Sequence, residues 1–249
     1  KLSLSQFIKK DTMESLSTCP FDSKVKEEVN EKTPIQEYKD LANSFRRDTV
    51  DMTTVAQSGH PTSCASMAEI AAVLFFHPNG MHYDPKEPKG FNADRFVLSK
   101  GHAAPLLYSV WAHNGYLEHS SLRGLKQIWS PLTGHPSPSV PFVDVASGSL
   151  GQGLSVTMGM AYAAKYIDKM DNKFFTLIGD AESAEGQVWE ACSFGASYKL
   201  DNVIAIIDCN RQGQSGPTIH KHELENYRKK FEAFGCQTIV IDGHDVAEV

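Results

Sequence analysis

Two polar side chains each follow an apolar run of the kind that forms a buried strand. Asp180 comes soon after residues 174–178, and Asn210 soon after residues 203–207, with about one helix length of chain between the runs. Parallel strands joined by a helix end at the same edge of a sheet, so these two side chains should lie together. Mg²⁺ takes carboxylate and amide oxygens as ligands and is also coordinated by phosphate oxygens of a ligand. The spacing predicts a site for a cation and a diphosphate; the alternative is that both residues only cap helices.

A glycine-rich segment, Gly-Ser-Leu-Gly-Gln-Gly at residues 148–153, precedes a predicted helix. Small residues in this position let backbone N–H groups approach an anion. A tight turn without a ligand accounts for the same composition, so both readings stay open.

Three histidines, His60, His102 and His135, each follow a glycine in a loop or at a strand end. Histidine moves protons near neutral pH and hydrogen-bonds to hydroxyls or phosphates. One loop histidine is usually a surface residue, whereas three in similar settings favour a shared site. Histidines without such a setting are expected at the surface: His77, His113 and His119.

Three acidic residues follow Asp180: Glu182, Glu185 and Glu190. The dipole of a helix favours acids near its N-terminus, which accounts for the first two. Glu190 lies further into the helix and needs a partner or solvent.

The helices and strands that must position these residues alternate along the chain. We expect helices near 34–56, 65–76, 103–114, 153–168, 186–199 and 222–233, and strands at 95–98, 173–178, 203–208 and 237–241. This alternation predicts an α/β fold with a parallel sheet and helices on both faces. Residues 1–33 are polar and weakly periodic, and we expect a flexible extension or weak helical arm before a domain at 34–249.

Composition narrows the function classes for these 249 residues. A formal net charge of −6 argues against a nucleic-acid partner. No apolar run approaches the roughly 20 residues of a membrane span, and we expect no membrane association and no signal peptide. The five cysteines form no CxxC pair, so reduced thiols in the cytoplasm are the expectation.

Five motifs occur in series: SGHPTS at 58–63, LSKGH at 98–102, GHP at 134–136, GSLGQG at 148–153, and GDAE at 179–182 leading to Asn210. Through them residues 35–249 resemble the amino-terminal, diphosphate-binding (PP) domain of transketolases, most closely the animal type. The resemblance implies the thiamine-diphosphate-binding fold, with thiamine diphosphate and Mg²⁺ (or Ca²⁺) as cofactors. It also implies transfer of a two-carbon ketol unit from xylulose 5-phosphate to ribose 5-phosphate, in the pentose phosphate pathway.

The resemblance implies a role for each matching residue. The implied metal ligands are Asp180, Asn210 and, through its main-chain carbonyl, Gln212. The implied cofactor contacts are Ser63, His102, Gly148, Ser149, Leu150, Ala181, Glu182 and Asn210. The implied catalytic residues are His60 for the donor oxyanion, His135 for the donor's terminal hydroxyl, and Glu185, which with Glu190 would join a carboxylate network across a dimer interface. Lys100 would add positive charge.

Two positions depart from the family pattern. Ala181 stands where the family has glycine, so we expect either strain, if φ is positive there, or a methyl group crowding the diphosphate; both weaken cofactor binding. Gln212 stands where animal relatives tend to have an apolar residue, which a carbonyl ligand tolerates.

The resemblance also implies partners: sugar phosphate substrates, a second, pyrimidine-binding domain or subunit, and a second copy in a homodimer. The family's later domains lie beyond Val249, so we expect this chain to be inactive by itself. Two alternatives stay open. One is a truncated, non-catalytic relative; the other is a subunit of a different thiamine-diphosphate enzyme, such as a 1-deoxyxylulose-phosphate synthase or a ketoacid dehydrogenase.

Overall fold

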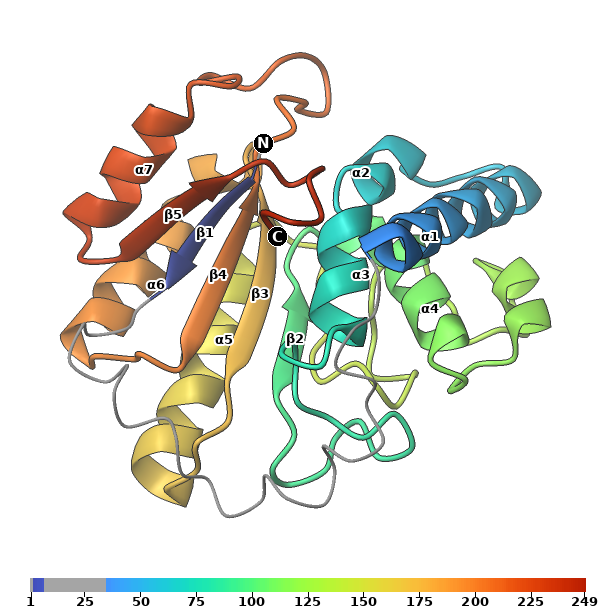
Figure 1. Cartoon of the computed structure of the whole chain (residues 1–249), viewed down its shortest axis with the longest axis horizontal. Coiled ribbons are helices and arrows are strands. Elements are labelled where there is room, and N and C mark those ends of the chain that lie inside the picture. The colour runs from blue at the N-terminus through green and yellow to red at the C-terminus, as the bar shows by residue number, and fades with distance from the viewer. Residues whose placement is uncertain (1, 7–34) are drawn as a thin grey trace.

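The structure is a computed structural model that describes residues 2–6 and 35–249. One sheet has the strand order β2-β3-β4-β1-β5 (Figure 1). The strands are β1 (Leu2–Gln6), β2 (Arg95–Leu98), β3 (Phe174–Gly179), β4 (Val203–Asp208) and β5 (Gln237–Ile241). β2, β3 and β4 are parallel, whereas β1 runs antiparallel to both β4 and β5. The predicted α/β fold with a parallel sheet is confirmed.

Strand β1 is the main departure from the sequence prediction. We expected residues 2–6 to belong to a flexible or weakly helical extension, and they form a strand between β4 and β5 instead. Leu2 and Leu4 alternate with Ser3 and Ser5, a period typical of a strand, and the backbone of β1 pairs with both β4 and β5. The rest of the predicted extension, residues 7–33, lies outside the described residues.

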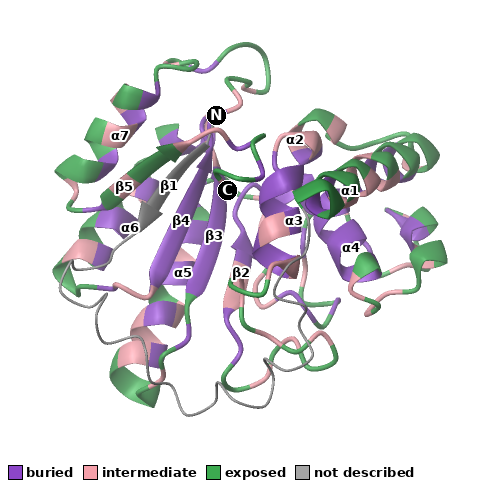
Figure 2. Ribbon diagram, viewed as in Figure 1, coloured by how far each residue is buried: buried purple, intermediate pink, exposed green. Residues whose placement is uncertain are grey.

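The buried strands send alternate side chains to opposite faces, and each face has its own core. Phe175 and Leu177 pack in one core, and Phe174 and Ile178 in the other. Figure 2 shows β3 and β4 buried along almost their whole length. Each fully buried side chain of this size contributes about 1.5–3 kcal/mol, so strands covered on both faces form the stable centre of the fold.

Two groups of helices cover the two faces (Figure 1). The first core contains residues of α1 (Ile35–Ala56), α2 (Pro61–Ala65), α3 (Ala68–Phe76) and α4 (Ala104–His113). The second contains residues of α5 (Gln152–Tyr162), α6 (Gly186–Ser197) and α7 (Leu224–Ala233). The expected arrangement, with helices on both faces, is therefore present.

Two predicted helices have different boundaries. The helix expected at 65–76 begins at Ala68 as α3. A separate short helix, α2, precedes it in a segment expected to be a loop, with Pro61 at its first position. The helix expected to reach residue 168 ends as α5 at Tyr162 and continues as a π-helical turn over Ala163–Asp168. Glu69, the only charge on α3, is buried and paired with Arg46 at 2.6 Å.

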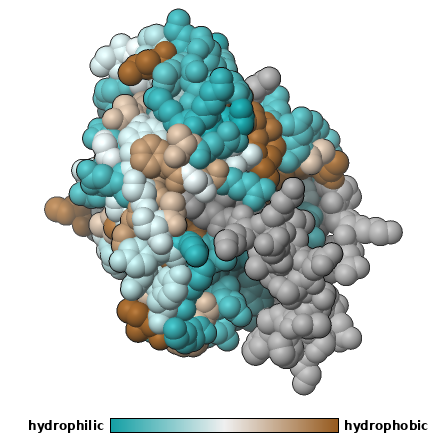
Figure 3. Space-filling model, turned by 90° about the vertical axis from the view of Figure 1, so that its left-hand side faces the viewer, coloured by the Kyte–Doolittle hydropathy of each residue, from teal (hydrophilic) through white to brown (hydrophobic). Residues whose placement is uncertain are grey.

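Within the described part of the chain, no helix combines the length and apolar character needed to cross a bilayer. Cys64, Cys192, Cys209 and Cys236 are buried, free thiols. Figure 3 shows that the face carrying α6 and α7 is mostly hydrophilic, with brown areas in separate spots. Such scattered apolar residues are normal on a protein surface.

A candidate site for a cation and a diphosphate

Asp180 and Asn210 lie at the carboxyl edge of the sheet, as their spacing predicts. Gly179 pairs with Asp208 in the β3–β4 register, so both side chains follow neighbouring strand ends. The Asp180 N–H donates to the Asp208 carbonyl at 3.1 Å, and the Arg211 N–H donates to Asp180 Oδ2 at 2.8 Å. These hydrogen bonds join the loop that follows β3 to the loop that follows β4, at the position where the cation is expected.

Both side chains are held by donors and keep acceptor capacity. Asp180 Oδ2 accepts from Arg211 N and from Thr218 Oγ1 at 2.9 Å, while its Oδ1 accepts only from Ala181 N, also at 2.9 Å. Asn210 Oδ1 accepts from Gln212 N at 2.9 Å. An oxygen of this kind has two acceptor directions, so each Oδ1 keeps one for a cation. Both side chains accept hydrogen bonds from backbone N–H groups, as the alternative of helix capping predicts, but these bonds occupy only some of their acceptor directions.

Burial raises the pKa of Asp180 above its ordinary value. Hydrogen bonds from Thr218, Arg211 and Ala181 lower the pKa, and the nearby Asp208 carboxylate raises it. A positive charge beside a buried carboxylate favours its ionised form. The donor set of Asp180 and Asn210 therefore fits a hard cation.

A buried ion pair that sequence reasoning missed supports this edge of the sheet. Lys100 and Asp208 are both buried, and Lys100 Nζ donates to Asp208 Oδ2 and to the Ser63 carbonyl, the latter at 2.8 Å. Ser66 Oγ donates to the same carboxylate oxygen. Lys100 therefore joins three segments of chain, and Asp208 compensates its charge. An acid ending an otherwise apolar strand, as in Val-Ile-Ala-Ile-Ile-Asp, is the one signal in the sequence that marks Asp208 as a residue needing a buried partner.

The three glycine-linked histidines converge beside this edge. His102 Nε2 lies 2.8 Å from Ser63 Oγ, and the rings of His60 and His102 are 5.1 Å apart between centroids. The His135 ring packs against Gly148, where a side-chain carbon would lie 3.1 Å from His135 Cδ2. Gly148 also has φ of +148°, which disfavours any other residue. The three histidines therefore lie close together, as their similar settings in the sequence predict.

The surroundings of His102 and His135 favour neutral rings. Burial, together with the charges of Lys100, His60 and His135, lowers the pKa of His102 to about 4. Burial, with Lys126 and His60, also lowers the pKa of His135. A neutral imidazole has one donor and one acceptor nitrogen, which suits recognition of hydroxyl groups.

Glu182 is buried and accepts three hydrogen bonds from the chain itself. Its Oε1 accepts from Gly151 N at 2.8 Å and from Ser99 Oγ, and its Oε2 accepts from Gly179 N at 3.0 Å. Burial raises its pKa, although these donors lower it. The side chain therefore joins the ends of β2 and β3 to the glycine-rich segment and holds these three segments in position.

The glycine-rich segment leads into α5. Ser149 and Leu150 are exposed, so both are open to a ligand. Gly153 is buried against Ser99, and a side-chain carbon there would lie 2.6 Å from Ser99 Cα. The segment therefore exposes Ser149 and Leu150 to solvent, while Gly153 lets α5 approach the end of β2 closely.

The expected strain at Ala181 is wrong. Its φ of −63° and ψ of −38° are helical values that any residue adopts. Only the second expectation remains, a methyl group near the diphosphate. This methyl faces the 210–218 loop, since a side-chain carbon on Gly213 would lie 4.0 Å from Ala181 Cβ. Gln212 is exposed in that loop, next to Arg211 with its positive φ of 62°.

Glu185 and Glu190 are both exposed. Glu185 precedes α6, and its Cβ would lie 2.9 Å from a side-chain carbon at Gly151. Neither carboxylate forms a salt bridge within the described residues.

The family model described as the transketolase thiamine diphosphate binding domain matches residues 37–249. This chain belongs to the transketolase family. It is 53% identical to transketolase from Homo sapiens over 215 residues, and 49% identical to human transketolase-like protein 2. A crystal structure of transketolase from Campylobacter jejuni superposes with a TM-score of 0.77 at 37% identity, covering 87% of this chain and 35% of that one. The human matches cover 86% and 85% of this chain, and the chain spans about a third (34%) of each of those relatives.

Proposed function

We propose that this chain forms the diphosphate-binding half of a transketolase active site. The whole enzyme would transfer a two-carbon ketol unit from xylulose 5-phosphate to ribose 5-phosphate, a reaction of the pentose phosphate pathway. The observation that carries the proposal is the position of Asp180 and Asn210 at one sheet edge, beside the cluster of His60, His102 and His135. Transketolase relatives that match over most of this chain support the same activity.

The residues divide into cation, cofactor and substrate contacts. Asp180, Asn210 and the Gln212 carbonyl would hold Mg²⁺ or Ca²⁺, consistent with the free acceptor directions of the two side chains. Ser63, His102, Ala181 and residues 148–150 would contact thiamine diphosphate. When bound, this cofactor supplies the carbon nucleophile needed to break and form bonds beside a carbonyl.

The chain's own contribution is orientation and proton placement. His60 is exposed at the rim and would donate a hydrogen bond to the oxygen that becomes negative on the donor sugar. His135, with its lowered pKa, would accept or donate to the donor's terminal hydroxyl. Glu182 would hold the loops that carry these contacts at a fixed spacing.

Further parts of the proposal concern partners and location. The exposed Glu185 and Glu190 are available for contacts with a second copy, which supports a homodimer that shares its sites. A pyrimidine-binding domain or subunit would complete the pocket. The free buried thiols support a reducing compartment, and we place the protein in the cytoplasm.

A non-catalytic relative is the second candidate. Ala181, in the position where the family has glycine, favours it, because a methyl group beside the diphosphate weakens binding. Cofactor binding without ketol transfer in the complete assembly would identify this case.

Thermal unfolding with thiamine diphosphate and Mg²⁺, together and separately, tests the cofactor half of the proposal. Both together should raise the unfolding temperature, because ligands that bind only the folded state stabilise it. Asp180→Asn should abolish that rise. Asp171→Asn is the matched control, since Asp171 is an exposed acid before the other end of β3. Equal stabilisation of wild type and Asp180→Asn would contradict the proposed cation site.

A further inference from the structure

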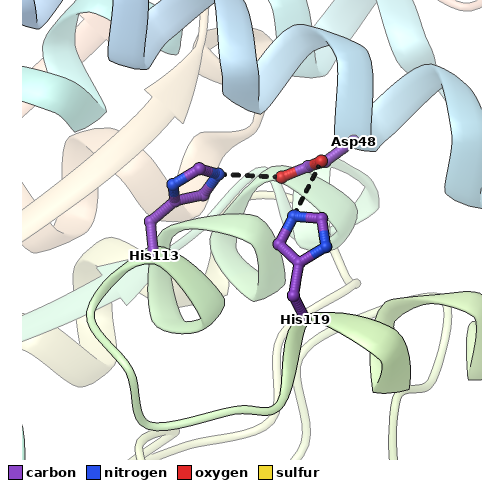
Figure 4. A group of neighbouring side chains, drawn as sticks. All are labelled: Asp48, His113 and His119. Carbon is purple, nitrogen blue, oxygen red and sulfur yellow. Dashed lines mark hydrogen bonds and ion pairs between the residues drawn. The ribbon is translucent and has the colours of Figure 1, made fainter.

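A second group of possible ligands lies away from the sheet edge. Asp48 on α1, His113 at the last position of α4 and His119 at the first position of the 3₁₀ segment His119–Gly124 point toward one another (Figure 4). His113 Nε2 lies 3.0 Å from Asp48 Oδ2, and His119 Nε2 lies 3.0 Å from Asp48 Oδ1. These histidines could not be joined from the sequence, because their partner Asp48 lies over 60 positions away.

The ligand types match a borderline divalent cation. Two imidazole nitrogens and one carboxylate oxygen are a common Zn²⁺ donor set, and all three atoms lie within 4.8 Å of one another. Tetrahedral coordination at bond lengths of about 2.0–2.1 Å places ligand atoms roughly 3.3 Å apart. The two 3.0 Å separations from Asp48 are therefore close to those of a tetrahedral site.

Two of the three side chains are already fixed. The Asp48 side chain is 11% exposed, and Ser109 Oγ donates to its Oδ2 at 2.5 Å. The His113 side chain is 26% exposed, and its ring packs edge-on against Phe45 with centroids 5.3 Å apart. The His119 side chain is 61% exposed and free to adjust. A rigid pair with one adjustable ligand and access to solvent suits binding from solution.

We propose that Asp48, His113 and His119 bind one Zn²⁺-type cation, with water as the fourth ligand. The competing explanation is a pair of histidine–carboxylate hydrogen bonds with no metal. The bound cation would clamp α1 to α4. The chain leaves α1 toward His60 and enters α4 from His102, so the clamp would hold the elements that carry two of the candidate active-site histidines.

Zn²⁺ titration of the chelator-treated, purified chain tests the proposal. Excess Mg²⁺ in the buffer keeps the sheet-edge site from contributing. Calorimetry should show one equivalent bound to wild type and to His82→Ala, a matched control in which an exposed histidine outside the cluster is removed. Asp48→Asn and His119→Ala should each lose that equivalent. Co²⁺ in place of Zn²⁺ should give visible absorption bands in wild type and not in these two variants.

Ser109, which donates a hydrogen bond to Asp48, allows a test in which Zn²⁺ binding should weaken without being lost. Ser109→Ala removes the hydrogen bond that orients Asp48 and should weaken Zn²⁺ binding about tenfold, in line with other residues that orient metal ligands. Because His119 is exposed, its alanine variant should unfold at the same temperature as the metal-free wild type. The proposal is wrong if wild type binds no Zn²⁺ under these conditions, or if His119→Ala binds as many equivalents as wild type.

Discussion

At the scale of single residues, Ala181 affects the ligand more than the fold. Its backbone is unstrained, so its only departure from glycine is a methyl group facing the loop that contains Asn210 and Gln212. Removing this methyl group makes room near the proposed diphosphate. Ala181→Gly should therefore bind thiamine diphosphate more tightly in a calorimetric titration with Mg²⁺, while its stability falls by roughly 0.5–1 kcal/mol from the added backbone freedom. Unchanged affinity would mean that the methyl group does not touch the ligand.

Glu182 illustrates a residue whose effect is on positioning. Its three donors all point at oxygens, so the amide of Glu182→Gln would face at least one N–H or O–H. We expect a loss of about 1–3 kcal/mol in the free energy of unfolding measured with urea, the cost of unsatisfied buried polar groups. Glu185→Gln is the control at an exposed acid in the same segment, with an expected change within about 0.5 kcal/mol. Equal effects of the two changes would remove Glu182 from its supporting role.

At the scale of elements, helix α5 contains two glycines with opposite surroundings. Gly153 touches the Ser99 backbone, whereas Gly159 has open space around its Cα. Gly153→Ala should force α5 away from the end of β2 and cost about 1–3 kcal/mol, as overpacking does. Gly159→Ala should instead stabilise the protein by roughly 0.5–1 kcal/mol, because alanine favours a helix interior. Urea unfolding of both variants measures the difference, and a stabilising Gly153→Ala would show that α5 does not pack closely there.

The elements also show what the sequence could predict. Apolar runs and helix-length spacing were enough to locate β3, β4 and α6, and hence the shared edge of Asp180 and Asn210. The pairing of Lys100 with Asp208 and the cluster at Asp48 could not be predicted, because each joins residues far apart in sequence through tertiary structure. Strand β1 was missed because its alternation, Leu-Ser-Leu-Ser at residues 2–5, is short and leads into a segment of mixed charge, although such alternation is typical of a strand.

At the scale of the whole molecule, His102 makes stability depend on pH. Its pKa in the folded state, about 4, lies below the ordinary value of 6.5, so the unfolded chain binds more protons between these values. The stability that His102 contributes is complete above pH 6.5 and is lost as pH falls toward 4. His102→Gln removes this contribution, so the stability gap between wild type and variant should narrow over that range in urea unfolding at several pH values. Parallel curves would show that His102 does not titrate differently in the folded state.

Strand β1 has a consequence for how the sheet assembles. It pairs with Ile204–Asp208 on one side and Gln237–Ile241 on the other, although it lies far from both in sequence. Contacts between such distant parts of a chain form slowly, since a long loop must close first. During folding β4 therefore has an open edge until Leu2–Gln6 reach it, and this edge is available to other strands. The sheet is thus most vulnerable to mispairing while this contact between distant segments has yet to form.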